Sequence, residues 1–397
     1  MISFDEALAL VLAEAQPLGR ERVALASAAG RVLAASVTAA IDSPRADVSA
    51  MDGYAVRDAD LGALPARLTV IGKSLPGAVL REQVERGTCV RIFTGAPIPS
   101  GADRIVVQEI VRREGEQAII DKATGPKTWI RPRGADFRSG DLLLPPGRVL
   151  DASALIAAAG ADLADVEVFR RPRLALLSTG DELVQPGEAR RSALAVPDSV
   201  SPGIAALAAE WGGMVVATSR LRDDLEAMRL AAGRAIEAAD VVVVTGGASV
   251  GERDFGKAMF ETVGLELCFS RIAMRPGMPA WFGRVGNKRI VGLPGNPTSA
   301  LVTARLLLAP LIAGMVGRSP DEAGRWEICR LASPLGECDA RETFHRAILD
   351  QDSATPIAFQ ESHAQKALAD ANALIRQPGH SPAMSKGASV RVLRLDW

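Results

Sequence analysis

Apolar strand patterns alternate with helical patterns between residues 173 and 316, and this alternation restricts the possible folds more than any other feature of the sequence. The run Val241–Val244 is continuous and β-branched, which is typical of a strand buried on both faces. Further strands are expected at Leu174–Leu177, Met214–Thr218 and Arg289–Leu293. Because strands that alternate with helices form βαβ units, we predict an α/β domain with a largely parallel sheet and helices on both faces.

Helix signals fill the intervals between these strands. Ser201-Pro202 supplies an N-cap residue and a proline at the first helical position, which predicts a helix that ends near residue 212. A second helix is expected over 223–239, where acidic residues occupy the first turn, and a third over 298–315. The most apolar part of the third helix, 301–316, contains Arg305 and is shorter than the ~20 residues of a membrane span.

Two regions rich in short strands flank the predicted α/β domain. Strand-like runs punctuated by Gly and Pro occur at 68–71, 88–92, 104–107 and 117–120, and again after about residue 322, ending at 388–393. Helical patterns are expected at 3–16 and 151–163. These runs predict a β-rich module near the N-terminus and a small β domain at the C-terminus.

Three of the predicted strands end in turns rich in glycine and small polar residues, at Ser178–Glu182, Thr245–Gly251 and Pro294–Pro297. Glycine lets the backbone approach a ligand closely, and exposed N–H groups beside a helix N-terminus bind anions. One such turn alone is equally well explained as a tight strand exit. Three of them at the carboxyl edge of one parallel sheet, where such folds bind ligands, favour a site for a phosphorylated, nucleotide-like ligand.

Acidic side chains accompany these turns, namely Asp181, Glu182, Asp223, Asp224 and Asp254. Carboxylates near a phosphate site often hold Mg²⁺, which prefers carboxylate, phosphate and water oxygens. For the two acids at 223 and 224, the opening of a helix is an equally good explanation. The acid at 254 follows a glycine-rich loop, and there the metal interpretation is stronger.

A proline-rich loop over Met274–Pro279 contains Arg275, a permanent cation suited to an oxyanion. An ordinary surface loop is the alternative interpretation. The single tyrosine, Tyr54, lies in another loop-like segment and is better explained by packing than by catalysis.

Composition and spacing exclude several classes of protein. A formal net charge of -1 and an aromatic content of 4% offer no basic or stacking surface for nucleic acid. The 4 cysteines are scattered, which predicts reduced thiols, and neither they nor the 3 histidines show zinc-site spacing. There is no P-loop and no nucleophile with a partnered base. The N-terminus lacks the pattern of a signal peptide, so we expect a cytoplasmic protein.

A series of short stretches follows the whole chain in a fixed order: Ser49–Val56, Thr94–Asp103, Arg133–Asp136, Ser178–Leu183, Gly246–Asp254, Gly292–Pro297, Phe344–Arg346 and Ala371–Leu374. In this order they resemble the molybdopterin molybdenumtransferase family, which includes MoeA and the E domain of gephyrin. Each stretch is weak evidence alone, whereas the collinear set is strong.

The resemblance implies four structural parts. They are a linking domain over 1–27 and 140–168, a β-rich inserted domain over 28–139, an α/β molybdopterin-binding domain over 169–318 and a C-terminal β domain over 319–397. It also implies an elongated homodimer, with the cleft between the α/β domain of one subunit and the inserted domain of the other. The implied reaction inserts molybdenum from molybdate into adenylylated molybdopterin with release of AMP, assisted by Mg²⁺. Molybdopterin adenylyltransferase and apo-molybdoenzymes are the implied protein partners.

Site residues follow from the same resemblance, position by position. The implied catalytic acids are Asp52, Asp136, Glu182 and Asp254, of which the first two reach in from the partner subunit together with Thr94. Asp223 and Asp254 would hold the metal, and Arg275, Arg346 and Ser362 would face molybdate. The remaining residues implied to bind the pterin-nucleotide are Thr179, Gly180, Asp181, Gly246, Gly247, Ser249, Gly251, Pro294, Gly295, Asn296 and Pro297.

Two departures from the family's pattern concern the chemistry. The family's loop usually reads Lys-Pro-Gly-Lys-Pro, whereas this chain has Arg275-Pro276-Gly277-Met278-Pro279, which lacks the second cation. The family also tends to show an Asn where this chain has Val200. Three functions therefore stay open: an active molybdenum insertase, a divergent paralogue that binds or delivers the cofactor or its precursor, and a molybdopterin adenylyltransferase.

Overall fold

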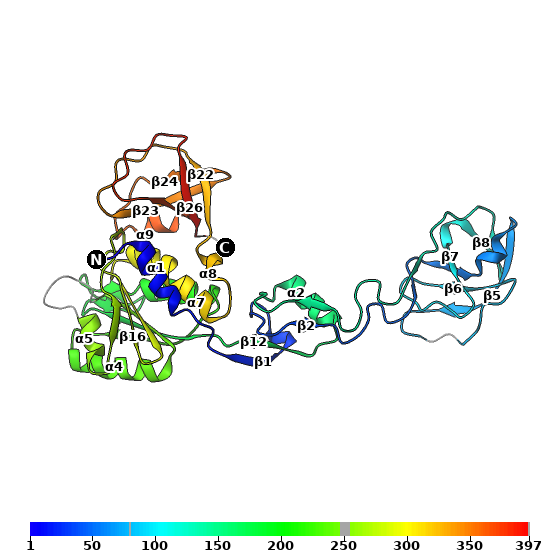
Figure 1. Ribbon diagram of the computed structural model, residues 1–397, viewed down its shortest axis with the longest axis horizontal. Helices are drawn as coiled ribbons and strands as arrows, with labels where there is room; N and C mark the ends of the chain where they lie inside the picture. Colours follow the sequence, from blue (N-terminus) through cyan, green and yellow to red (C-terminus); the bar gives the residue numbers. More distant parts are fainter. Residues whose placement is uncertain (79–80, 247–254, 396–397) are drawn as a thin grey trace.

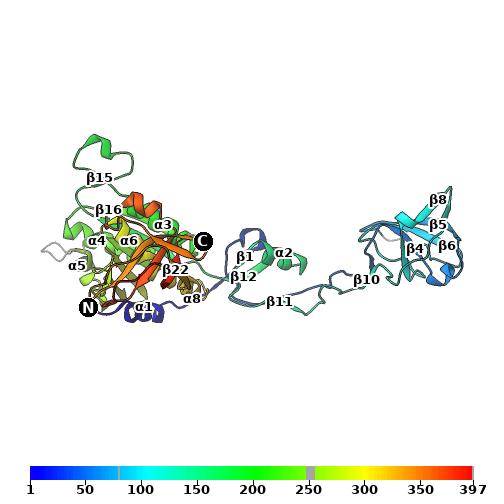
Figure 2. The same ribbon diagram turned by 90° about the horizontal axis from the view of Figure 1, so that it is seen from above.

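The computed structural model describes residues 1–78, 81–246 and 255–395 and shows an elongated molecule (Figure 1). The α/β domain and the C-terminal β domain lie together at one end, and the β-rich domain lies at the other. A small linking region, which contains α2 (Ala152–Gly160), connects the two ends in both views (Figure 2). The chain reaches the distant β-rich domain and returns, so the linking region is built from two separate segments.

The α/β domain contains a six-stranded sheet in the order β16-β13-β17-β21-β20-β18. β13 (Arg173–Thr179), β16 (Met214–Leu221), β17 (Val241–Thr245) and β21 (Lys288–Leu293) are parallel, as the sequence predicts. At one end of the sheet, β20 (Trp281–Val285) and the edge strand β18 (Glu266–Phe269) are antiparallel to their neighbours and were not predicted.

The alternating side chains of β17 pack into two different cores, which explains why the whole strand is apolar. Val241 and Val243 lie in the cluster beneath α3 (Val200–Glu210), while Val242 and Val244 lie in the cluster beneath α4 (Leu225–Ala238) and α5 (Phe255–Glu261). All four valines are 0% exposed. Each buried valine of this size contributes about 1.5–3 kcal/mol, so the strand is a major source of stability for the domain.

A long helix follows β21 and continues through α6 (Pro297–Thr303), a π-helical segment Ala304–Leu308 and α7 (Ala309–Met315). At 19 residues it has the length and apolar composition of a membrane span, and it is longer than the apolar stretch predicted from the sequence. In this structure 94% of its apolar window is buried, and its residues form much of the core of the α/β domain. Its burial identifies it as a core helix.

The N-terminal helix α1 (Phe4–Ala13) begins with a capping box between Ser3 and Glu6. It packs against α7 and the C-terminal domain, and the ring of Phe4 lies 4.9 Å from that of Phe344. Within the predicted linking segment 1–27, the assignment of α1 needs correction, because its apolar face is buried in the core of the α/β domain.

The linking region pairs β1 (Arg20–Ala24) with β12 (Asp165–Phe169), and β2 (Val37–Thr38) with β11 (Leu142–Leu144). Its core joins Leu33 and Val37 to the apolar side of α2. The predicted boundary at residue 28 therefore lies too early, since residues up to about 39 pack here and not in the β-rich domain.

The β-rich domain holds a six-stranded sheet in the order β7-β4-β6-β5-β9-β8. β6 (Thr88–Ile92), β7 (Arg104–Val107) and β9 (Gln117–Ile120) have the predicted bounds, β5 (Ala66–Ser74) is longer than predicted, and β4 (Gly53–Val56) and β8 (Val111–Glu114) complete the sheet. Short strands β3 (Val48–Ser49) and β10 (Ile130–Arg131) pair beside it.

The C-terminal domain forms a sheet in the order β19-β23-β24-β22-β26-β25. Its strands are β22 (Trp326–Leu331), β23 (Glu342–Asp350), β24 (Ser353–Pro356), β25 (Ala373–Gln377) and β26 (Ser389–Arg394), with α9 (Gln365–Ala369) between β24 and β25. The sixth strand, β19 (Met274–Arg275), comes from the α/β segment and pairs in parallel with β23. This pairing joins the proline-rich loop to the C-terminal domain.

Candidate functional site: a cleft at the carboxyl edge of the parallel sheet

The order of the parallel strands locates a topological switch point between β13 and β17. The chain leaves β13 for β16 on one side and then crosses back to β17 on the other. In open α/β sheets, ligands bind in the crevice at the carboxyl ends of two such strands. Here these ends are Thr179 and Thr245, which open two of the predicted turns, and Thr179 Oγ1 donates to the carbonyl of Thr245 at 3.4 Å.

Glycines form the floor of this crevice because nothing larger fits. Gly246 has φ +85°, and a Cβ at this position would lie 2.6 Å from the carbonyl oxygen of Thr179. A Cβ on Gly295 would lie 3.3 Å from the Cα of Gly246. The turns after β17 and β21 therefore approach each other backbone to backbone, a contact that only glycine allows.

A buried polar network lies directly under the floor. The hydroxyls of Ser178 and Ser201 are 2.8 Å apart, and Thr245 Oγ1 donates to Ser178 Oγ at 3.1 Å. Asp198, only 3% exposed, accepts from Ser178 Oγ at 3.3 Å and from the backbone N–H of Ser201 at 3.1 Å. Fully satisfied networks of this kind are rigid, so the carboxyl ends of β13 and β17 hold a fixed spacing.

The same network corrects the predicted start of α3. The helix begins at Val200, its N-cap residue Ser199 makes no side-chain cap bond, and Ser201 is already inside the helix. The prediction of Ser201 as the N-cap is wrong, because the Asp198 carboxylate accepts the N–H of Ser201 from outside the helix. A carboxylate at this position also suits the positive end of the helix dipole.

The cleft above this floor has a volume of about 790 Å³. Predicted site residues that line it are Thr179, Gly180, Glu182, Asp223, Gly246, Pro294, Gly295, Asn296 and Pro297. The lining also includes Asp198 and Val200, and two C-terminal-domain residues that sequence reasoning missed, His363 and Gln365. The described lining residues include carboxylates and one histidine but no lysine or arginine, so the cleft itself offers no permanent cation.

Asp181 and Asp224 have structural roles beside the cleft. The carboxylate of Asp181 accepts the backbone N–H of Asp223 at 3.1 Å, and the carboxylate of Asp224 caps α4 by accepting from Glu226 and Ala227. The helix-opening explanation is confirmed for Asp224. Asp223 lines the cleft, held there by the turn that Asp181 supports.

The C-terminal domain closes one side of the cleft through the segment that contains Ser362. Asn296 Nδ2 donates to Ser362 Oγ at 3.1 Å, and the backbone N–H of Thr298 donates to the Ser362 carbonyl at 3.2 Å. Both bonds join the turn after β21 to the segment that carries His363. Ser362 therefore lies beside the glycine-rich floor, next to a residue of the predicted ligand site.

Arg346 lies on β23, where its guanidinium is buried. It is 1% exposed and donates to three backbone carbonyls, those of Phe359, Glu361 and Ala364, at 3.0–3.2 Å. Burial lowers the pKa of this guanidinium. Arg346 therefore holds the 359–364 loop and is not among the described residues that line the cleft, and its contact with molybdate stays a prediction.

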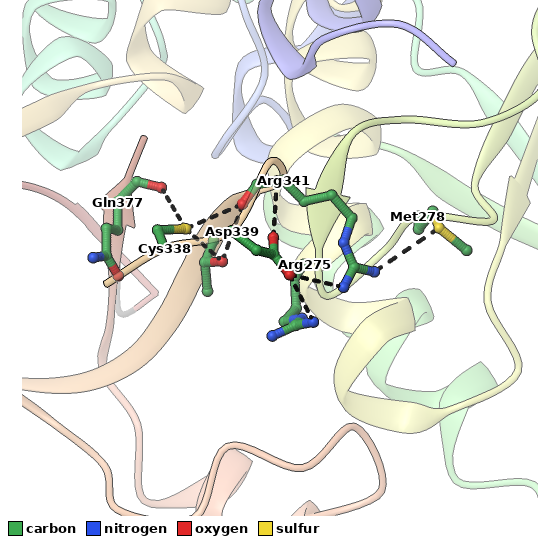
Figure 3. A network of polar contacts seen from close by, with 7 residues as sticks. Arg275, Met278, Cys338, Asp339, Arg341 and Gln377 are labelled. Atoms are coloured by element: carbon green, nitrogen blue, oxygen red, sulfur yellow. Dashed lines mark hydrogen bonds and ion pairs between the residues drawn. The ribbon is translucent and has the colours of Figure 1, made fainter. Parts of the chain in front are cut away.

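Arg275 lies at the end of β19, outside the main cleft, and lines a smaller cavity of about 170 Å³. Its guanidinium pairs with Asp339 at 3.2 Å, and Arg341 pairs with the same carboxylate oxygen at 3.3 Å (Figure 3). The pKa of Asp339 is lowered, first by the backbone N–H of Arg341 and then by its side chain. Met278 lies beside Arg341 in this network, 3.9 Å from Nη1 to Sδ.

The family is decided by comparison with known proteins. Family models match three consecutive regions: the MoeA N-terminal region (domain I and II) over residues 2–161, the probable molybdopterin binding domain over 175–314, and the MoeA C-terminal region (domain IV) over 329–395. The molybdopterin molybdenumtransferase of Haemophilus influenzae is 34% identical over 399 residues, covering 99% of this chain and 98% of that protein. This chain belongs to the MoeA family.

Other relatives agree with this assignment. The molybdopterin molybdenumtransferase 2 of Mycobacterium tuberculosis is 34% identical over 93% of this chain and 94% of its own length. The crystal structure of the molybdopterin biosynthesis MoeA protein from Pyrococcus horikoshii superposes with a TM-score of 0.84 at 30% identity, covering 100% of both chains. The predicted multidomain fold of the MoeA family is thereby confirmed, and the names of the relatives make it a family of transferases.

The acids that the MoeA resemblance assigns to the partner subunit lie far from the cleft within one chain. Asp52 belongs to the β-rich domain, where its carboxylate accepts both the N–H and the hydroxyl of Thr94 at 2.8 Å. These bonds, the backbone one first, lower the pKa of Asp52. Asp136 lies between β10 and β11, in the segment that leaves the β-rich domain. The two ends of the molecule are separated by the linking region (Figure 2).

Four predicted site residues of the MoeA pattern, Gly247, Ser249, Gly251 and Asp254, lie outside the described residues. Within the described ranges, no group of three or more His, Cys, Asp or Glu side chains could hold a metal ion by itself. His363, Gln365 and Arg341 escaped sequence reasoning because each depends on contacts between the α/β and C-terminal domains. The only sequence signal for the two cleft residues was their position next to Ser362.

Proposed function

We propose that this protein inserts molybdenum from molybdate into adenylylated molybdopterin and releases AMP, as part of molybdenum cofactor biosynthesis. The observation that carries the proposal is the cleft of about 790 Å³ at the β13/β17 switch point, floored by Gly246 and Gly295. A backbone floor with exposed N–H groups suits the phosphates of a nucleotide-bearing substrate. The names of the relatives supply the substrate class.

In this proposal each part of the cleft has a distinct task. Backbone N–H groups of the turns at Gly246 and Gly295 bind the phosphates, and the buried network of Asp198, Ser178 and Thr245 keeps the two strand ends at a fixed spacing. Asn296 and Ser362 align the C-terminal domain with the ligand. The preorganised donors need no rearrangement when charge develops on the leaving AMP, which is the largest contribution that such a site makes to catalysis.

We further propose that Mg²⁺ enters with the substrate, and the donor set fits this. Mg²⁺ is commonly held by one or two carboxylates together with substrate phosphates, without an all-protein cage. Glu182 and Asp223 both line the cleft and could supply these carboxylates, together with Asp254 of the predicted set. When bound, the ion would neutralise phosphate charge in a cleft whose described lining has no lysine or arginine.

The proposal includes a homodimer, because one chain alone separates the implied partners. Asp52 and Thr94 lie in the β-rich domain, at the opposite end of the elongated molecule from the cleft (Figure 1). If these residues and Asp136 act on the ligand, a second subunit must bring them. A cytoplasmic location is also proposed, supported by four free cysteines, as expected of a reducing compartment.

The function is tested by incubating the full chain with adenylylated molybdopterin, Mg²⁺ and molybdate. We expect molybdate-dependent AMP release and reconstitution of an apo-molybdoenzyme. Nucleotide binding without either product would instead support a divergent binding protein, and formation of adenylylated molybdopterin from molybdopterin and ATP would support an adenylyltransferase.

The dimer is tested by complementation between Asp52→Ala and Asp223→Ala. Each variant alone should be inactive, and random mixing of equal amounts should restore about a quarter of the wild-type sites, since half of the dimers are mixed and each has one intact site. The refolded wild-type chain is the matched control for the mixing procedure. No recovery in mixtures that contain mixed dimers would contradict an active site shared between subunits.

A further inference from the structure

Arg275 and Arg341 converge on a single carboxylate oxygen at the junction of two domains. Asp339 Oδ2 accepts from Nη2 of Arg275 at 3.2 Å and from Nη2 of Arg341 at 3.3 Å. Figure 3 shows the two guanidiniums approaching Asp339 from different directions. A point where two guanidiniums meet one oxygen can also accept another anion, because both groups are already oriented toward it.

The attachment of Asp339 suggests that it can be displaced. Its other oxygen, Oδ1, accepts the backbone N–H of Arg341 at 2.9 Å, so the carboxylate is anchored to its own loop by one oxygen only. The side chains of Arg275 and Asp339 are 55% and 49% exposed, and that of Arg341 is 29% exposed. An anion can therefore reach the two guanidiniums from solvent without opening a buried core.

Two features connect this cluster to the cleft. Arg275 and Asp339 line the cavity of about 170 Å³, whose walls also include Glu337 and Gln377, whereas Arg341 reaches Asp339 from outside this lining. Pro279, on the same loop as Arg275, lines the main cleft. The loop from Arg275 to Pro279 is at most about 14 Å long when fully extended, so a ligand in the small cavity lies near the cleft.

The position of Arg341 also bears on Met278. Arg341 Nη1 lies 3.9 Å from Met278 Sδ, so a guanidinium from the C-terminal domain occupies the space beside a loop position that has no charge of its own. The pairing of β19 with β23 produces this contact, because it places Arg275 opposite Thr343, two residues after Arg341. The chain thereby gathers two cations at the loop although the loop contains only one.

We propose that Arg275 and Arg341 form a receiving site for a tetrahedral divalent oxyanion, and that Asp339 is the internal counterion which this oxyanion displaces. The identification of the oxyanion as molybdate rests on the proposed function, whereas the two-guanidinium site rests on geometry alone. A dianion carries twice the charge of the carboxylate and offers each guanidinium its own oxygen. Arg341 acts here as a residue that binds the anion in place of a cation at position 278.

Binding of molybdate alone to the full chain tests the site, measured by equilibrium dialysis with tungstate and sulfate as competitors. Arg341→Gln should weaken molybdate binding about tenfold, which corresponds to about 1.4 kcal/mol. The matched control is Arg330→Gln, which removes the same charge from an exposed arginine of the same domain, on β22, and should leave the affinity unchanged. Equal affinities of the two variants would overturn the proposal.

Asp339→Asn gives the most discriminating result, because the two explanations predict opposite signs. If Asp339 competes with the oxyanion, removing its charge should strengthen molybdate binding several-fold. If Asp339 serves only to hold the arginines in place, the same change should weaken binding, and that result, or no change, would refute the proposal. Thermal melting of each variant shows whether the fold is retained.

Substitution at position 278 provides a second, independent test. Met278→Lys in the Arg341→Gln background should restore most of the lost affinity, whereas Met278→Lys alone should bring little gain because it places two like charges side by side. Failure of the double variant to recover would count against Arg341 as the replacement cation. Molybdate binding is measured without nucleotide, so it tests the two-arginine site independently of AMP release, which tests the proposed function. A negative result in one assay therefore does not affect the interpretation of the other.

Discussion

The close approach of Gly246 to Thr179 provides the strictest test of the cleft geometry. Gly246→Ala adds a Cβ that would lie 2.6 Å from the Thr179 carbonyl oxygen and 2.8 Å from its Oγ1, at a residue with φ +85°. The left-handed backbone costs an alanine about 1 kcal/mol, and the forced shift of a packed backbone adds about 1–3 kcal/mol. We therefore expect a loss of about 3 kcal/mol in the free energy of unfolding of the α/β domain.

Gly233→Ala is the matched control, because it adds the same atom with the opposite expected sign. Gly233 lies inside α4, and a Cβ there would meet nothing within 4 Å. Alanine in a helix interior is more stable than glycine by about 0.5–1 kcal/mol. The control should therefore melt slightly higher than the wild-type chain.

The assay is thermal unfolding followed by circular dichroism, combined with calorimetric titration of AMP. At about 2–4 °C per kcal/mol for a domain of this size, Gly246→Ala should lower the melting temperature by about 6–12 °C. AMP affinity should also fall, because Thr179 must move away from the floor of the cleft. If Gly246→Ala melts like the wild-type chain and binds AMP equally well, the backbone contact between the two turns is not as described.

Three further changes test other parts of the molecule. Arg346→Lys keeps the charge, but a single ammonium cannot replace bonds that two separate nitrogens make to three carbonyls, so the chain should be less stable by about 1–3 kcal/mol. An unchanged melting temperature with altered molybdate dependence would favour direct anion contact. Burial lowers the pKa of His345, and the hydrogen bond to Gln377 opposes this shift. The contribution of the neutral imidazole to the free energy of unfolding is therefore fully present above pH ~6.5 and is lost as the pH falls. His345→Gln should flatten this pH dependence in denaturant titrations at pH 7.5 and 5. Asp52→Ala should lower AMP release at least about tenfold with little change in melting, and activity equal to wild type would exclude a role for its carboxylate in catalysis.

The parallel sheet and its glycine-rich edge could be predicted because both are encoded locally. The valine run of β17 indicates a strand buried on both faces, and the glycine-rich residues that form each turn directly follow the strand in the sequence. The antiparallel edge formed by β18 and β20 could not be predicted, because antiparallel and parallel partners share the same short apolar pattern. The order of strands depends on pairing between distant segments, which no local pattern contains.

The site residues divide in the same way. Gly246 and Asn296 could be predicted because each belongs to a turn at a strand end. Arg346 could not be placed, because the sequence does not show that its guanidinium is used by carbonyls from a loop more than ten residues away. Arg341 gave no sequence signal at all, since its relation to Met278 arises only when β19 pairs with β23.

In the proposed function, the distribution of charge directs the nucleotide phosphate and the oxyanion to different sites. The described lining of the main cleft carries the carboxylates Glu182, Asp198 and Asp223 and no lysine or arginine, so a free oxyanion gains little there, whereas a phosphate that arrives with Mg²⁺ is attracted. The guanidiniums of Arg275 and Arg341 meet at Asp339 and are not among the described residues that line the main cleft, so the proposed oxyanion would need no metal there. Under the two proposals, each anion is selected by the sign of the protein charge that it meets. Moving a permanent cation into the main cleft should therefore let sulfate compete with nucleotide, which it should not do in the wild-type chain.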